Sequence, residues 1–106
     1  MCQVKHGDVK PEKKALLEYL AACEGTLRSI TMAPEVEGGL ELVEEVLFAG
    51  VNPSIGHTNA TYEQARAMAD EGATLVTHLF NAMPPLHHRD GGAVCAGLLS
   101  PRVYCE

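Results

Sequence analysis

Hydrophobic positions along the chain alternate between two spacings. From Pro11 to Cys23 the apolar residues lie three and four positions apart, which is typical of a helix that packs on one side. Leu27 to Ala33 follows as a short alternating run and predicts a β-strand. The pattern then recurs, with helical spacing over residues 40–47 and a predicted strand from Val51 to His57.

A third helix and strand complete the repeated pattern. Thr61 can cap the start of this helix, and Gln64 three residues later completes a capping box. Gly72 is a typical helix stop. The segment from Ala73 to Leu79 is rich in Thr, Val and Leu, and we expect it to form a third strand.

The spacing of these elements predicts an α/β fold with parallel strands. The strands start 24 and 22 residues apart (27 to 51 and 51 to 73), which leaves room for one helix between them. A loop rich in Pro, His and Gly covers 81–92, and 96–105 is expected to begin a fourth strand. Two architectures fit this pattern, a small three-layer sandwich or three to four βα units of a (β/α)8 barrel, which needs about 250 residues.

Composition and charge restrict the classes of function. Hydrophobic residues make up 46% of the 106 positions and charged residues 21%, so the chain is expected to form one globular domain over 1–106. The net charge of −6 argues against a nucleic acid or an anionic membrane as partner. No long apolar stretch or signal pattern occurs, and we expect a cytoplasmic location. The four cysteines form no C-x-x-C pair and are expected to be ordinary reduced thiols.

Polar residues gather at the predicted strand ends. His57 ends the second strand, His78 ends the third, and Asn81 follows closely. Neighbouring strands lie about 5 Å apart. Two imidazoles at this edge could therefore reach one metal ion through bonds of about 2.0–2.1 Å. From spacing alone, two hydrogen-bonded structural histidines are an equally good interpretation.

Four short segments carry a resemblance to a known family. They are Met-Ala-Pro-Glu at 32–35, Gly-His-Thr-Asn-Ala at 56–60, Thr-His-Leu-Phe-Asn-Ala-Met at 77–83 and His-Arg-Asp at 88–90. In this order they resemble the N-acetylglucosamine-6-phosphate deacetylases, which belong to the amidohydrolase superfamily. The resemblance covers roughly residues 30–100 and implies a slice of a (β/α)8 barrel.

The resemblance also implies a metal site. The family's histidines that match His57 and His78 ligate a divalent metal, which we expect to be zinc, with iron, manganese or cobalt also possible. The family adds a glutamate from an HLEGP motif and a catalytic aspartate from a TDA motif, and neither motif occurs in this sequence. We therefore expect no catalytic acid or base within the chain and place that aspartate beyond its C-terminus.

Substrate contacts follow from the same resemblance. Asn81 and Ala82 match the pair that binds the sugar phosphate. Arg89 matches an arginine that contacts the phosphate across a dimer interface, so the full-length enzyme is expected to be a homodimer. His6 lies at about the spacing of a sugar-contacting histidine, although its surroundings match poorly. Position 91 is Gly where the family commonly has Pro.

Five further polar residues are given structural interpretations. Glu35 is expected to sit near the start of the following helix, where the helix dipole favours a carboxylate. Thr58 and Thr77 are expected to serve β-strand propensity. His87 and His88 are expected to be solvated loop residues.

The expected function is metal-dependent hydrolysis of N-acetylglucosamine 6-phosphate to glucosamine 6-phosphate and acetate by the full-length enzyme. This chain is expected to be an inactive fragment of it, with a small amino-sugar phosphate as its partner molecule. Two alternatives stay open. One is another amidohydrolase, such as a dihydroorotase-like enzyme, and the other is a non-catalytic metal-binding or assembly module.

Overall fold

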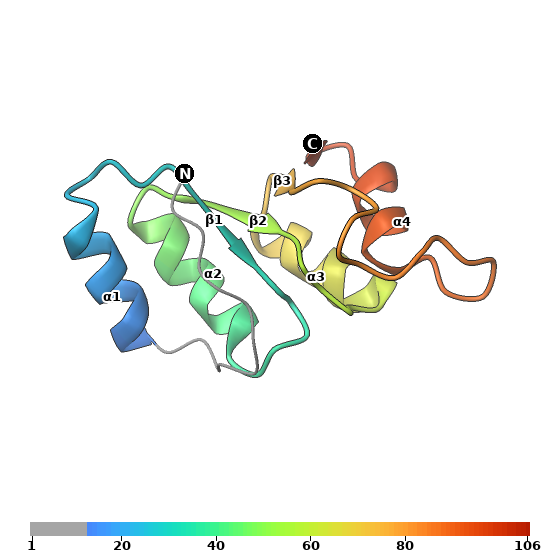
Figure 1. Cartoon of the computed structure of the whole chain (residues 1–106), viewed down its shortest axis with the longest axis horizontal. Coiled ribbons are helices and arrows are strands. Elements are labelled where there is room, and N and C mark those ends of the chain that lie inside the picture. Colours follow the sequence, from blue (N-terminus) through green and yellow to red (C-terminus); the bar gives the residue numbers. More distant parts are fainter. Residues whose placement is uncertain (1–12) are drawn as a thin grey trace.

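The structure of the protein is a computed structural model that describes residues 13–106. The predicted helix start at Pro11 and the candidate residue His6 lie outside the described residues. Helices and strands alternate along the chain (Figure 1). Their bounds are α1 (Lys13–Ala22), β1 (Ser29–Met32), α2 (Gly39–Phe48), β2 (Asn52–Ile55), α3 (Tyr62–Glu71), β3 (Leu75–Val76), α4 (Gly92–Leu99) and β4 (Tyr104–Cys105).

The four strands form one parallel sheet in the order β1-β2-β3-β4. Ile55 of β2 pairs with Met32 of β1 on one side and with Val76 of β3 on the other. A helix separates each strand from the next, as parallel strands require, and Figure 1 shows the helices succeeding one another in chain order. The predicted α/β class with parallel strands is confirmed.

Two aliphatic clusters form the core. The larger joins the sheet to α2, α3 and α4, and its members are Val43, Ile55, Ala60, Ala65, Met68, Ala69, Ala73, Val76, Ala93 and Ala96. The smaller joins α1, α2 and β1, and its members are Leu16, Leu27, Ile30, Leu42, Val46 and Val51. The small residues of α3 and α4 allow these two helices to pack together, which places the loops before them side by side.

The signals predicted for the third helix are present. The Thr61 hydroxyl accepts a hydrogen bond from the Gln64 backbone at 3.2 Å, and the Gln64 side chain accepts one from the Thr61 backbone at 2.9 Å. Gly72 ends the helix with a φ of 131°, a conformation that L side chains rarely adopt. This capping fixes where the loop after β2 joins α3.

The second and third strands are shorter than predicted. β2 ends at Ile55 instead of at residue 57, and β3 comprises only Leu75 and Val76. The cause is backbone geometry, because His57 and His78 have φ values of 46° and 36°. A left-handed residue cannot continue an extended strand, so both histidines lie in the loops that follow.

The predicted fourth strand over residues 96–105 is wrong for its first part. Residues up to Leu99 belong to α4, and only Tyr104 and Cys105 form a strand. Most residues of α4 are buried, so the helix lacks a polar side that would reveal its period. An apolar run of this kind is ambiguous between a strand and a buried helix. Within residues 13–106, no helix is long and apolar enough to cross a membrane.

Replacing Ile55 with alanine should destabilise the fold strongly. Its side chain is 1% exposed at the centre of the sheet, and such truncations cost about 2–5 kcal/mol of unfolding free energy. Phe48→Ala is the control, since Phe48 is 94% exposed and its loss should change stability by no more than about 0.5 kcal/mol. Urea unfolding followed by circular dichroism measures both values. Equal losses for the two variants would contradict this core.

Candidate functional site

Two histidines meet at the carboxyl end of the sheet. His57 follows β2, His78 follows β3, and their Nε2 atoms lie 2.8 Å apart. Their ring centroids are 4.6 Å apart, and the ring planes are inclined by 68°. Both side chains are partly buried. The structure therefore brings together the two predicted metal ligands, and their role as ligands remains a prediction.

The backbone around this pair is unusual. Besides the two histidines, Phe80 and Ala82 have left-handed φ values of 76° and 54°. Such conformations cost on the order of 1–3 kcal/mol each for residues other than glycine. They concentrate at functional sites, where the surrounding contacts hold them in place. Four of them in the loops after β2 and β3 indicate that this edge of the sheet is functional.

One hydrogen bond determines the protonation of His78. Its Nδ1 lies 3.0 Å from the backbone oxygen of Asn81, and a carbonyl oxygen can only accept. Nδ1 of His78 therefore carries the proton, and in the neutral ring its Nε2 has a free lone pair. That lone pair faces His57, whose own Nε2–H donates to it. A carbonyl partner of this kind also orients imidazoles that bind metals.

The donor set fits a divalent metal ion in part. The separation of 2.8 Å is shorter than two nitrogen–metal bonds of about 2.0–2.1 Å placed end to end, so one ion can contact both rings. Within residues 13–106, no group of three or more His, Cys, Asp and Glu side chains is placed to hold an ion. The described part of the chain thus supplies two nitrogen ligands.

The described cysteines do not add to this site. Cys23, Cys95 and Cys105 are free thiols, as expected. Partial burial raises the pKa of the Cys105 thiol, so it remains protonated at neutral pH. A protonated thiol is a poor metal ligand, because the thiolate is the form that binds.

A network of hydroxyl groups lies beside the pair. Thr77, which precedes His78, has its Oγ1 2.6 Å from Oγ of Ser54 and 3.0 Å from Oγ1 of Thr31. Thr77 is buried and lies outside β3, so the strand-propensity role predicted for it is wrong. Gly56 is required here, since a Cβ at that position would lie 2.7 Å from Cγ2 of Thr31.

Glu35 makes contacts that the sequence did not suggest. Its carboxylate accepts hydrogen bonds from the Thr58 hydroxyl and, at 2.7 Å, from the backbone N–H of Asn59. These donors belong to the loop after β2, so the predicted role at the start of the next helix is wrong. Thr58 is outside β2, and its hydroxyl serves this contact instead of strand propensity. The position of Glu35 after a strand was the one available signal.

Asn81 and Ala82 lie close to the histidine pair. The backbone N–H of Asn81 donates to the backbone oxygen of His78 at 2.9 Å, and its side-chain amide donates to Leu79 at 3.4 Å. The backbone oxygen of Ala82 accepts from Thr58 at 3.0 Å. Both residues are exposed, so a ligand at the pair could contact them.

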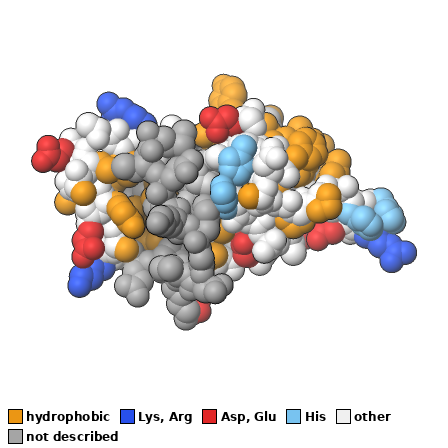
Figure 2. All heavy atoms as spheres, viewed as in Figure 1, with side chains coloured by type: hydrophobic (Ala, Val, Ile, Leu, Met, Phe, Trp, Pro, Cys, Tyr) orange, Lys and Arg blue, Asp and Glu red, His pale blue; other side chains and the backbone are white. Residues whose placement is uncertain are grey.

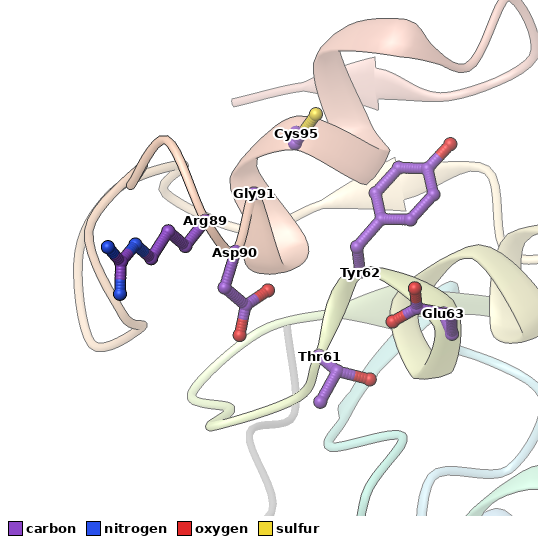
Figure 3. Close-up of a pocket in the computed structure, with 7 residues that line it drawn as sticks. All are labelled: Thr61, Tyr62, Glu63, Arg89, Asp90, Gly91 and Cys95. Atoms are coloured by element: carbon purple, nitrogen blue, oxygen red, sulfur yellow. The ribbon is translucent and has the colours of Figure 1, made fainter.

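Arg89 lies in a different place, on the loop between β3 and α4. Its backbone N–H donates to Nδ1 of His87 at 3.1 Å, and its side chain is exposed. The residue lines a cavity of about 340 Å³. The other lining residues are Thr61, Tyr62, Glu63, Asp90, Gly91 and Cys95 (Figure 3). Figure 3 shows the guanidinium turned away from Tyr62 and Glu63, so it does not close this cavity.

The second pair of histidines belongs to the same loop. The rings of His87 and His88 lie 4.3 Å apart, and both side chains are exposed, as expected for solvated loop residues. Figure 2 shows histidine side chains in two separate groups, one over the middle of this face and one at its end. The described residues therefore do not bring the two histidine pairs together.

Comparisons with known proteins agree with this site. No family model matches the chain. The chain is 38% identical over 98 residues to an N-acetylglucosamine-6-phosphate deacetylase of Lysinibacillus sphaericus, covering 92% of this chain and 25% of that protein. It is also 39% identical over 89 residues to an N-acetylgalactosamine-6-phosphate deacetylase of Escherichia coli, covering 84% of this chain and 24% of that protein.

Solved structures show the same relationship. A mutant of N-acetyl-D-glucosamine-6-phosphate deacetylase from Mycobacterium smegmatis, in complex with N-acetyl-D-glucosamine-6-phosphate, is 44% identical with a TM-score of 0.88. The match covers 90% of this chain and 25% of that one. The enzyme from Thermotoga maritima is 33% identical with a TM-score of 0.79, and the same shares are covered. By sequence and by structure, the chain is homologous to the N-acetylglucosamine-6-phosphate deacetylases and spans about a quarter of their length.

Proposed function

We propose that this chain forms part of an enzyme that hydrolyses the acetamide of N-acetylglucosamine 6-phosphate, giving glucosamine 6-phosphate and acetate. One observation carries the proposal. The His57 and His78 rings meet at 2.8 Å, within the two segments that most resemble the deacetylases. Similarity to deacetylases over most of the chain supports the same activity.

The fold supports a place within a (β/α)8 barrel, with residues 1–106 as a partial domain. Four parallel strands follow one another in chain order with a helix between each pair. A barrel is built from consecutive units in this way. A doubly wound sandwich reverses its strand order at a switch point, and residues 13–106 contain no such reversal.

His57 and His78 would hold the divalent metal. Nitrogen donors suit zinc, and iron, manganese and cobalt bind similar sites. When bound, the ion supplies Lewis-acid polarisation of the acetyl carbonyl. The carbonyl of Asn81 keeps the His78 proton on Nδ1, so Nε2 is available as a ligand without a change of tautomer.

The substrate contacts are assigned by position and chemistry. Asn81 and Ala82, exposed beside the pair, bind the amino-sugar phosphate. Arg89 offers a permanently charged planar fork for phosphate oxygens, and its place on an exposed loop suits a contact across a homodimer interface. His6 is assigned to the sugar and lies outside the described residues.

A non-catalytic metal-binding or assembly module is the second candidate. Its support is that residues 13–106 bring only two metal ligands together. A dihydroorotase-like activity is less well supported, because the curated relatives named above are amino-sugar-phosphate deacetylases.

A chimeric enzyme tests the proposal. The chain replaces the matching segment of the Mycobacterium smegmatis deacetylase, to which it is 44% identical. With zinc added, the chimera should release acetate from N-acetylglucosamine 6-phosphate and much less from unphosphorylated N-acetylglucosamine. N-acetylgalactosamine 6-phosphate shows whether the sugar epimer matters. A folded, zinc-loaded chimera that releases no acetate from any of these compounds would refute the proposed activity.

A further inference from the structure

We propose that Glu35 is a positioning residue that holds His57 in place to meet His78. Glu35 acts through Thr58 and Asn59, the two residues that follow His57. The inference rests on the proposed metal-binding role of the histidine pair. It assigns to a carboxylate of the loop after β1 a function in a site formed by the loops after β2 and β3.

The contacts of Glu35 are specific to this loop. One carboxylate oxygen accepts from the Thr58 hydroxyl, and the other accepts from the backbone N–H of Asn59 at 2.7 Å. Both donors follow His57 directly in sequence, and hydrogen bonds to an ionised acceptor are the stronger kind. The carboxylate therefore fixes the chain just beyond the histidine.

Thr58 extends this contact to the third loop. Its side-chain oxygen also accepts from the backbone N–H of Ala60 at 2.9 Å, and its own N–H donates to the backbone oxygen of Ala82 at 3.0 Å. The loops after β1, β2 and β3 are thus connected from Glu35 through Thr58 to Ala82. Ala82 follows Asn81, whose carbonyl orients His78. One chain of contacts therefore reaches both imidazoles.

His57 needs such support because its own conformation is unfavourable. Its φ of 46° ends the β2 ladder, and the residues after it form no regular structure before α3. Thr58 is 2% exposed, so loss of Glu35 would leave its buried hydroxyl without an acceptor. Without this anchor the loop has less to hold it in the strained conformation.

The test uses the whole 106-residue chain and zinc as the probe. Glu35→Ala should weaken zinc binding about tenfold, the lower end of what loss of an outer-shell partner costs. Glu35→Gln should cause a smaller loss, since its amide oxygen can still accept from Asn59. Thr58→Val should match Glu35→Ala, and Thr58→Ser should restore affinity because it keeps the hydroxyl. Adding Glu35→Ala to Thr58→Val should cost little more, as expected for one coupled pair.

Two controls separate positioning from charge and from stability. Glu44→Ala removes a carboxylate from the exposed surface of α2 and should leave zinc affinity unchanged. Val46→Ala truncates a fully buried residue of the smaller core cluster. It should lower stability without changing the zinc affinity of the folded chain. Equal loss of affinity in Val46→Ala and Glu35→Ala would reduce Glu35 to a general structural role and overturn the proposal.

A metal-free measurement distinguishes this proposal from the proposed function. Proton–nitrogen NMR spectra of the imidazoles report the tautomers and the contact between His57 and His78. Glu35→Ala should convert the two rings to averaged signals, and Thr58→Ser should retain the wild-type spectrum. Unchanged spectra together with unchanged zinc affinity in Glu35→Ala would refute the positioning role. If zinc binding proves independent of both histidines, the metal role fails while the spectra still decide whether Glu35 positions His57.

Discussion

Replacing His78 with alanine should abolish zinc binding by the chain. Residues 13–106 supply two nitrogen ligands, whereas catalytic zinc sites usually have three protein ligands and structural sites four. The wild-type chain should therefore hold zinc weakly, and loss of either ring leaves one ligand. The effect should exceed the roughly 10–100-fold loss caused by removing a partner of a ligand. His57→Ala should have the same effect, since the two Nε2 atoms are equivalent donors to one ion.

Calorimetric titration of zinc into each variant measures this loss. His88→Ala is the matched control, because it removes an imidazole from the exposed pair on the loop before α4. Its zinc affinity should equal that of the wild type. Tight stoichiometric binding that survives the loss of both His57 and His78 would place the metal elsewhere. Tight binding lost only in His88→Ala would assign it to the exposed pair.

The helices were predictable because their signals are local. The capping box of Thr61 and Gln64 and the stop at Gly72 act within a few residues of each other, and they set the bounds of α3. The helical spacing over residues 40–47 likewise predicted α2, which spans Gly39–Phe48. Local signals of this kind do not depend on distant contacts, so they can be interpreted from one sequence.

The strand ends and α4 were predicted less well. His57 and His78 look like the last residues of strands, and only tertiary contacts reveal their left-handed backbones. α4 is buried among the other elements, so the polar positions that would mark its helical period are missing. In both cases the surroundings of the segment decided its conformation.

The candidate site was predictable at its centre and not at its support. Equivalent positions at successive strand ends predicted that His57 and His78 would meet. The contacts of Glu35 join residues 23 and 24 positions apart through side-chain hydrogen bonds. The contact between Ser54 and Thr77 spans 23 positions in the same way. Such contacts have no period and no spacing rule, so no sequence pattern reveals them.

The chain by itself should release no measurable acetate from N-acetylglucosamine 6-phosphate. Its sequence contains neither the HLEGP nor the TDA motif that the family resemblance associates with a metal ligand and the acid/base aspartate. Loss of a general base alone typically lowers the rate by about 10²–10⁴. Among residues 13–106, no third metal ligand stands beside His57 and His78. The two deficits act on the same reaction, so turnover should fall below detection.

An acetate assay at saturating zinc checks this expectation, with the chimeric enzyme as positive control. In the chimera, His78→Ala should reduce acetate release to background, because the barrel then supplies the other groups and lacks this ligand. Metal-dependent turnover by the isolated chain would contradict the prediction. If that turnover disappeared in Glu35→Gln or His88→Ala, that residue would be doing the acid/base work assigned here to an aspartate outside the sequence.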